Sequence, residues 1–144
     1  MKIQDVINFA KDYGGRGIFT DWTDDEVRQH LCLHQRNGTL IVVHDNNGIS
    51  GLLTYRRIKE FDGDIVPHFW SQSDNQGKDV YIHELCSRRE DATYTLFAAF
   101  EEANGDAPEL SYWAHRQYNL KRYKYRDLKR LKLWESQNHL PHPI

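Results

Sequence analysis

Apolar residues recur along this chain with two different periods, and each change of period predicts a change of secondary structure. Near the N-terminus, apolar residues spaced by three and four predict a short amphipathic helix over Ile3–Tyr13. A second helix is predicted to begin after Thr23, which forms a capping box with Glu26, and to end at Asn37-Gly38. The first part of the chain is therefore expected to be helical.

The middle of the chain has the pattern of a β-hairpin. Thr39–His44 is rich in β-branched residues, Asp45–Gly48 has turn chemistry, and Ile49–Ile58 is a second strand-like run. A further short strand is predicted over Ile65–Trp70, followed by a polar loop over Ser71–Lys78. These runs predict an antiparallel hairpin.

The second half alternates strand and helix. Strands are predicted over Asp79–Cys86 and Leu110–His115, with a helix over Asp91–Asn104 between them. Such a unit implies a parallel strand pair joined by a right-handed crossover. A basic, aromatic segment over Lys121–Trp134 has mixed helical spacing and is predicted as the last helix. The expected fold class is α/β (α+β), with a mixed central sheet flanked by helices.

Length and composition fit one domain over residues 1–144, with residues 136–144 as a loose tail. The apolar fraction is 39%, yet no apolar run approaches the roughly 20 residues of a membrane helix. The N-terminus shows no signal-peptide pattern. Cys32 and Cys86 follow no metal or redox spacing. We therefore expect a reducing, cytoplasmic setting in which both thiols are buried.

Charge is divided unequally along the chain. Residues 1–110 carry 11 Lys/Arg and 19 Asp/Glu, whereas residues 111–144 carry 8 Lys/Arg and 2 Asp/Glu. Basic side chains neutralise phosphates and tyrosines stack on bases, so the basic segment 121–132 suits nucleic acid, an acidic protein or a phosphate-bearing cofactor. A solvated helix face, or packing on the acidic body, is the alternative. The candidate anion-binding residues are Lys121, Arg122, Lys124, Arg126, Lys129 and Arg130.

The order of elements resembles the GNAT superfamily of N-acetyltransferases. The resemblance is carried by the hairpin Thr39–Ile58, the strand and helix Val80–Asn104, and the strand Leu110–Trp113. It implies a splayed parallel strand pair and a cofactor, acetyl-CoA or another acyl-CoA, whose pyrophosphate lies at a helix N-terminus. It also implies transfer of an acyl group to an amine of a small molecule or a protein.

The turn after Cys86 is where the resemblance implies cofactor binding. Its two arginines can hold phosphates, but the glycines of the family motif are absent, and Glu90 and Asp91 bring negative charge to the helix end. A solvated loop whose acids stabilise the helix is the alternative interpretation. The implied cofactor-binding residues are Leu85, Ser87, Arg88, Arg89, Ala92 and Thr93.

Amine acylation needs a general base and a general acid. The resemblance implies Glu84 as the base, on the strand before the cofactor loop, and Tyr123 as the acid, in the last helix. In a regular strand His83 points to the face opposite Glu84. An ion pair at the sheet edge is the alternative role for Glu84.

Two histidines stand at metal-ligand spacing. His30 and His34 are separated by four residues on the second predicted helix, which is a spacing that can hold a metal ion. No His-Glu-x-x-His pattern surrounds them, so no metal cofactor is expected.

Two further functions remain open. The first alternative to an acyltransferase is a catalytically degenerate GNAT-like interaction module, such as a phage or mobile element could encode. The second is a nucleic-acid-binding protein that uses segment 121–132. The sequence pI near 6.4 counts against the second, because nucleic-acid-binding domains are usually basic overall.

Overall fold

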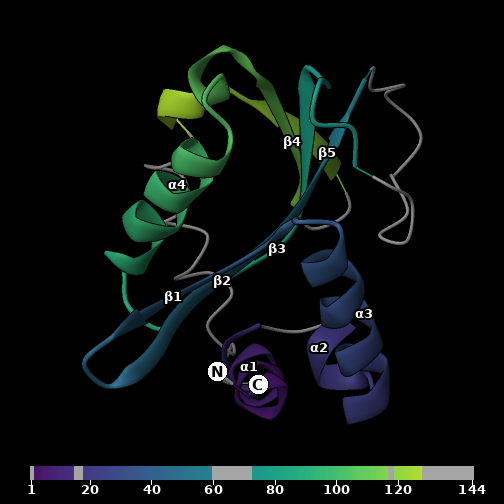
Figure 1. Cartoon of the computed structure of the whole chain (residues 1–144), viewed down its shortest axis with the longest axis vertical. Coiled ribbons are helices and arrows are strands. Elements are labelled where there is room, and N and C mark those ends of the chain that lie inside the picture. The colour runs from purple at the N-terminus through teal and green to yellow at the C-terminus, as the bar shows by residue number, and fades with distance from the viewer. Residues whose placement is uncertain (1, 15–17, 60–72, 117–118, 128–144) are drawn as a thin grey trace.

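The computed structural model describes residues 2–14, 18–59, 73–116 and 119–127, and these form a mixed sheet with helices on both faces (Figure 1). Helix α4 covers one face, and α1, α2 and α3 lie on the other. In chain order the elements are α1 (Ile3–Tyr13), α2 (Ile18–Asp21), α3 (Asp24–Arg36), β1 (Leu40–Asp45), β2 (Gly48–Ile58), β3 (Asp79–Ser87), α4 (Ala92–Ala103), the short 3-10 helix η1 (Ala107–Glu109), β4 (Ser111–Arg116) and β5 (Asn119–Tyr123).

The sheet confirms the predicted fold class. Its five strands follow the order β1-β2-β3-β4-β5, and only β3 and β4 run parallel. Helix α4 connects these two strands, as the strand–helix–strand pattern predicted. The β1–β2 hairpin closes at Gly48, whose φ of 112° requires a residue without a Cβ.

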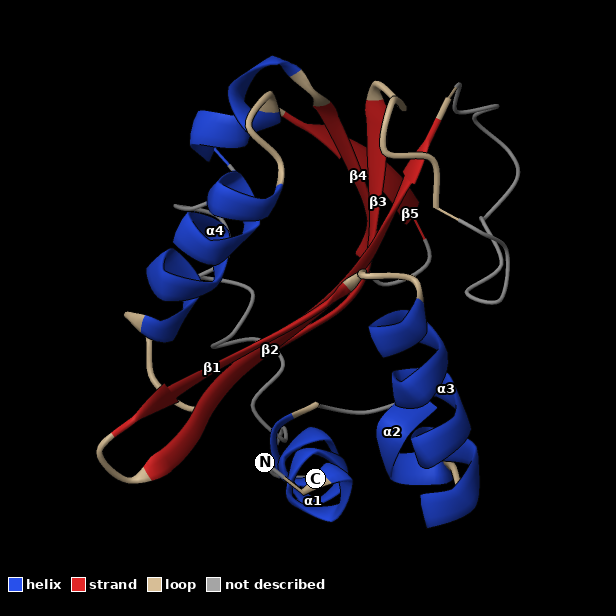
Figure 2. Ribbon diagram, viewed as in Figure 1, coloured by secondary structure: helices blue, strands red, loops and turns tan. Residues whose placement is uncertain are grey.

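The parallel pair separates after a short shared segment. Asp79–Ile82 pairs with Ser111–Ala114, while β3 continues to Ser87. Beyond Ile82, the β4-facing edge of β3 therefore has no strand partner among the described residues. Figure 2 shows the β1–β2 hairpin extending away from β4 and β5 at this end of the sheet.

A β-bulge changes which side chains of β3 share a face. Thr54 pairs with Glu84 and Tyr55 pairs with Ile82, so His83 is the extra residue on β3. Because one extra residue breaks the strand alternation, His83 and Glu84 both face α3. The expectation of opposite faces for these two residues was wrong, since it assumed a regular strand.

Two apolar clusters lie on the two faces of the sheet. The cluster beneath α4 includes Leu53, Tyr55, Val80, Ile82, Leu96, Phe97, Phe100 and Tyr112. The cluster beneath α1 and α3 includes Val6, Ile7, Phe9, Phe19, Val27, Leu31, Leu52 and Cys86.

The helices of the first part follow the predicted boundaries closely. Helix α1 spans Ile3–Tyr13, and the capping box at the start of α3 is formed. The Glu26 amide donates to the Thr23 hydroxyl over 3.2 Å, and the Thr23 amide donates to the Glu26 carboxylate over 3.0 Å. In the described part of the chain, no helix combines the length and apolarity needed to cross a bilayer.

The predicted last helix over Lys121–Trp134 was wrong for its first residues. Lys121, Arg122 and Tyr123 belong to β5, because pairing with β4 places them in the sheet. Helical geometry appears only at residues 125–127. The remainder of this segment, the predicted strand Ile65–Trp70 and the predicted tail 136–144 lie outside the described residues.

Both cysteines are free thiols. Cys86 is buried as expected, whereas Cys32 is only partly buried, so the expectation of two buried thiols holds for one of them.

Candidate functional site

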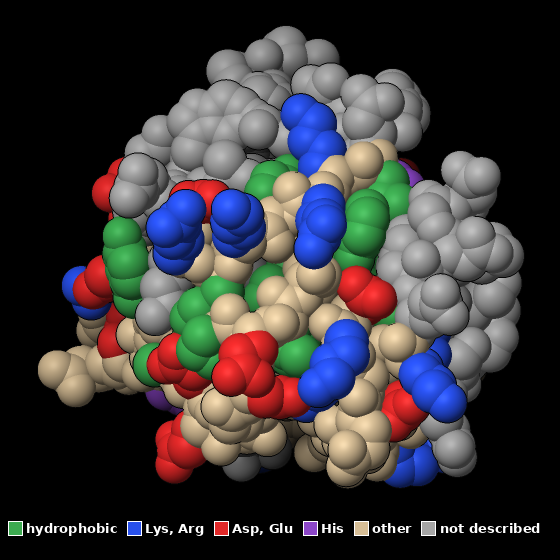
Figure 3. All heavy atoms as spheres, turned by 90° about the horizontal axis from the view of Figure 1, so that it is seen from above, with side chains coloured by type: hydrophobic (Ala, Val, Ile, Leu, Met, Phe, Trp, Pro, Cys, Tyr) green, Lys and Arg blue, Asp and Glu red, His purple; other side chains and the backbone are tan. Residues whose placement is uncertain are grey.

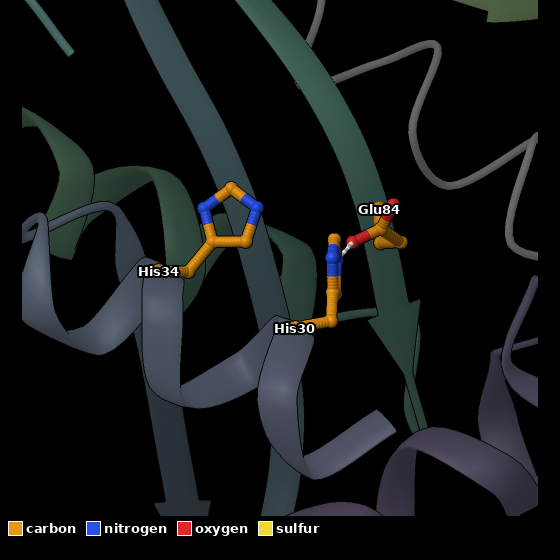
Figure 4. Close-up of side chains that lie close together, drawn as sticks. All are labelled: His30, His34 and Glu84. Carbon is orange, nitrogen blue, oxygen red and sulfur yellow. Dashed lines mark hydrogen bonds and ion pairs between the residues drawn. The ribbon is translucent and has the colours of Figure 1, made fainter. Parts of the chain in front are cut away.

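A cluster of polar side chains lies between α3 and the sheet, within an otherwise apolar interior. We call His30, His34, His83 and Glu84 the histidine cluster. His30 and His34 come from α3, and His83 and Glu84 come from the bulged part of β3. The His30 and His34 side chains are fully buried, and the Glu84 side chain is 9% exposed. Figure 4 shows His30 and Glu84 pointing toward one another, with His34 one turn further along α3.

The sequence of α3 explains why these histidines point inward. Residues four apart lie on the same face of a helix, so His30 and His34 share one stripe. The same side of α3 buries Val27 and Leu31 against the sheet. The apolar side chains anchor the helix, and the two imidazoles are thereby held over β2 and β3.

Glu84 is held by hydrogen bonds from two elements. Its Oε1 lies 2.5 Å from Nε2 of His30 and accepts a hydrogen bond of 2.5 Å from the Thr54 hydroxyl. The Glu84 amide donates to the same hydroxyl over 3.0 Å. Among the described residues, Oε2 of Glu84 accepts no hydrogen bond. One carboxylate oxygen is therefore fixed in place by two hydrogen bonds, whereas the other is not.

His34 is oriented by Thr39, at the start of the hairpin. Its Nδ1 lies 2.7 Å from the Thr39 hydroxyl, and its ring centre is 4.7 Å from that of His30 and 5.2 Å from that of His83. The Nε2 atoms of His34 and His83 are buried and have no hydrogen-bond partner among the described residues. Buried polar atoms are usually satisfied, so these two nitrogens call for an explanation.

Burial keeps two of the histidines neutral. The pKa of His34 falls to about 3, chiefly because burial disfavours the charged ring, with further repulsion from His30 and Arg56. The pKa of His83 falls to about 2 for the same main reason, with repulsion from His34, His30 and Arg56. Both rings are therefore uncharged imidazoles at neutral pH, with a nitrogen lone pair available.

A tyrosine stands beside the cluster on the same face. The Tyr81 hydroxyl lies 2.7 Å from Nδ1 of His115, and its ring centre is 4.7 Å from that of His83. Burial, together with the nearby Glu84 charge, raises the pKa of Tyr81 to about 12. The phenol is therefore protonated at neutral pH.

The predicted catalytic pair is not brought together. Glu84 faces α3, whereas Tyr123 packs against the apolar cluster beneath α4. Because the sheet lies between them, the two side chains do not form one site.

The predicted phosphate-binding arginines are paired with carboxylates. Arg88 donates two hydrogen bonds of 2.6 Å to Asp45 in the hairpin turn, and Arg89 lies 2.9 Å from Asp91 and 3.5 Å from Asp45. Arg88 also donates to the carbonyl of Ile49. Half of the Arg89 side chain stays exposed, so it is the more accessible of the two.

The remaining predicted cofactor residues serve local packing. Leu85 packs against the cluster beneath α4, and the hydroxyls of Ser87 and Thr93 lie 3.1 Å apart. Ala92 and Thr93 are buried at the start of α4. The turn between β3 and α4 is therefore stabilised by contacts among its own side chains.

The basic segment is described only in its first part. Lys121, Arg122, Lys124 and Arg126 are exposed, and Lys129 and Arg130 lie outside the described residues. A pocket of about 550 Å³ is lined by Arg122, Lys124 and Arg126 together with tyrosine side chains. Figure 3 shows that basic side chains on the face seen from above are interspersed with acidic ones. The face seen in that view is therefore mixed in charge.

Comparison of the chain with protein-family models, with curated proteins and with solved structures gives no match.

Only part of the histidine cluster is visible in the sequence. The spacing of His30 and His34 and the strand position of Glu84 are readable there. The contact between His30 and Glu84 joins residues 54 positions apart, and the inward turn of His83 depends on the bulge. No local pattern predicts either of them.

Proposed function

We propose that this chain is a GNAT-like acyltransferase that transfers an acyl group from acetyl-CoA or another acyl-CoA to an amine, with Glu84 as the general base. The observation that carries the proposal is the opening between β3 and β4, which begins beside Glu84. The acceptor is an amine of a small molecule or a protein, and we place the reaction in the cytoplasm.

The opening offers a binding edge for an extended ligand. After Ile82, β3 continues for five residues that no strand of the described chain pairs with on the β4 side. Backbone amides and carbonyls of such an edge can bond an added extended segment. The pantetheine arm of coenzyme A is extended and contains amide groups, so it suits this edge.

Glu84 supplies the chemistry at the start of the opening. The acceptor nitrogen attacks the thioester carbonyl, a carbon–nitrogen bond forms and the carbon–sulfur bond breaks. The nitrogen proton passes to Oε2 of Glu84, while His30 and Thr54 hold Oε1 in place. The coenzyme leaves as a thiolate and takes its proton from water.

Tyr81 replaces Tyr123 as the tyrosine in this proposal. It lies on the same face as Glu84 and remains protonated at neutral pH. Its hydroxyl can donate a hydrogen bond to the leaving sulfur when Nδ1–H of His115 donates to the phenol oxygen. Tyr123 packs on the opposite face.

The test combines a transfer assay with a binding assay. We expect acetyl-CoA at 100 times its Kd to stabilise the chain by about 2.7 kcal/mol, measured by thermal unfolding. Thiol release with a panel of amines is expected to fall by roughly 10²–10⁴-fold in Glu84→Gln. Glu109→Gln, which changes an exposed carboxylate, is the matched control.

The outcomes separate the competing functions. Neither stabilisation nor transfer contradicts the proposal and favours an interaction module that has lost the cofactor. Stabilisation by acetyl-CoA without transfer to any amine contradicts the transfer step alone. Full transfer by Glu84→Gln removes Glu84 from the mechanism.

A second candidate function is binding of a nucleic acid by segment 121–132. Its support is the pocket lined by three cations and tyrosine side chains on and after β5. Single-stranded oligonucleotide binding should then weaken steeply between low and high salt, and Arg122→Ala with Lys124→Ala should reduce the salt dependence. Salt-independent binding, or none, contradicts it.

A further inference from the structure

The histidine cluster contains a ligand set for a metal ion. One nitrogen each from His30 and His34 and one oxygen of Glu84 all lie within 4.8 Å of one another. We propose that these three residues bind a divalent transition-metal ion, with Zn²⁺ as the probe. The site goes beyond the proposed acyl transfer and does not depend on it.

The spacing of the ligand atoms is close to what zinc needs. With zinc–nitrogen and zinc–oxygen bonds of about 2.0–2.1 Å, tetrahedral ligand atoms are about 3.3 Å apart. Nε2 of His30 and Oε1 of Glu84 are now 2.5 Å apart, joined through a hydrogen bond. A metal ion would take the place of the shared proton and separate these atoms by roughly 1 Å, a shift that small side-chain rotations can supply.

The donor types select the class of metal. Imidazole suits zinc, iron, copper and nickel, whereas Mg²⁺ and Ca²⁺ prefer sites made only of oxygen. Two histidines and one carboxylate leave at least one coordination position open. His83 stands next to that position, with its ring centre 5.2 Å from that of His34.

Supporting hydrogen bonds already orient the ligands. The Thr39 hydroxyl binds Nδ1 of His34, which leaves Nε2 to face the cluster. The Thr54 hydroxyl binds Oε1 of Glu84. Such outer partners fix the direction of metal ligands in proteins.

The burial of two unpaired nitrogen atoms is a second and independent reason to expect a metal ion in the histidine cluster. Nε2 of His34 and Nε2 of His83 are buried without a hydrogen-bond partner in the described chain, and an unsatisfied buried polar atom is costly for a folded protein. A coordinated ion satisfies the His34 nitrogen and places a positive charge beside the Glu84 carboxylate. Arg56 faces the same cluster, and its charge opposes a cation there, so the affinity is expected to be lower than in a site without it.

The experiment uses the full chain after treatment with a chelator and desalting. Titration with Zn²⁺ by calorimetry is expected to give one equivalent bound, and Co²⁺ is expected to show the visible absorption of a four- or five-coordinate ion. His34→Ala and Glu84→Gln should each weaken Zn²⁺ binding at least about 100-fold, and Thr39→Val about 10–100-fold. His44→Ala, which removes an exposed histidine of β1, should leave binding unchanged.

A measurement on the unaltered chain covers the case in which a variant fails to fold. Zn²⁺ should shift the side-chain ¹⁵N resonances of His30 and His34 and leave those of His44 in place. Absence of stoichiometric binding, or shifts confined to His44, overturns the proposal. Equal Zn²⁺ affinity in a folded His34→Ala variant also overturns it.

The metal test is separate from the acyl-transfer test. Zn²⁺ binding is measured without acyl-CoA, and acyl transfer is measured with chelator present. If both proposals hold, Zn²⁺ occupies the carboxylate that acts as base and is expected to inhibit transfer.

Discussion

The two faces of the sheet are built from different chemistry. Beneath α4, aromatic and aliphatic side chains such as Phe97, Phe100 and Tyr112 fill the interior. Beneath α3, the interior contains His30, His34 and Glu84 as well as an apolar cluster. Burying polar and charged groups costs free energy unless they are paired. A fold that packs one face with apolar groups and keeps histidines in the other points to function on the α3 face.

The largest effect expected from a single substitution is a loss of packing on the α4 face. Phe100 is buried, and its ring contacts Tyr55 at 4.8 Å and Tyr112 at 5.8 Å between centres. Phe100→Ala is expected to lower the free energy of unfolding by about 3–5 kcal/mol, measured by denaturant titration. Zn²⁺ affinity of the folded fraction should not change, and a weakened affinity would mean that the two faces are coupled.

The next effect is a loss of stability in acid, which we expect from the buried histidines on the α3 face. His34 is buried with a pKa of about 3, and the groups that face it are His30, His83 and Arg56. Below pH 6.5 the unfolded chain binds protons at His34 and His83 that the folded chain does not. The free energy of unfolding should therefore fall as the pH drops from about 6.5 to about 4.5, by about 1.4 kcal/mol per pH unit for each histidine.

Denaturant titrations at several pH values, with chelator present, measure this slope. His34→Gln should remove about half of it, whereas His44→Ala should not alter it. A stability that stays constant over this pH range would show that the two rings are protonated in the folded chain.

A smaller loss of stability is expected when the Thr54 hydroxyl on the α3 face is removed. Thr54→Val keeps the side-chain shape but removes the partner of both the amide and the carboxylate of Glu84. We expect a loss of about 1–3 kcal/mol, measured by thermal unfolding. Thr54→Ser keeps the hydroxyl and should lose less. An unchanged stability for Thr54→Val would mean that the bulge does not need this hydrogen bond.

The smallest effect concerns the helix that carries the histidines. Thr23→Ala removes the hydroxyl that caps α3 and should cost about 1 kcal/mol in thermal or denaturant unfolding. Thr23→Ser retains the cap and serves as the control. Since the cap lies outside the histidine cluster, a large change in Zn²⁺ affinity would indicate that the position of α3 is set by its first turn.

Local patterns predicted most of the elements because the forces behind them are local. Helix α1 follows from apolar spacing, and the start of α3 follows from the Thr23–Glu26 capping box. The β1–β2 hairpin follows from β-branched runs around a turn that ends in Gly48. The parallel pair follows from the alternation of strand and helix, because a crossover can only return parallel.

The basic segment shows where local spacing misleads. Lys121–Tyr123 has side chains compatible with a helix, yet these residues form β5 because β4 offers an unpaired edge. Pairing with another strand depends on a contact outside the segment, so the spacing of apolar residues within the segment does not predict it. The ion pair of Arg88 is also invisible to local pattern, since its partner Asp45 lies 43 residues earlier, at the end of β1.

By itself, the sequence determined the mixed α+β fold class, the hairpin, the crossover unit and the position of Glu84 on the strand before the turn. Tertiary structure alone decided that His30 meets Glu84, that the bulge brings His83 to the same face, and that Tyr123 lies on the other. The physical reason is that periodicity and capping act within a few residues. The histidine cluster depends on the register of two strands and on the packing of a helix from a distant part of the chain.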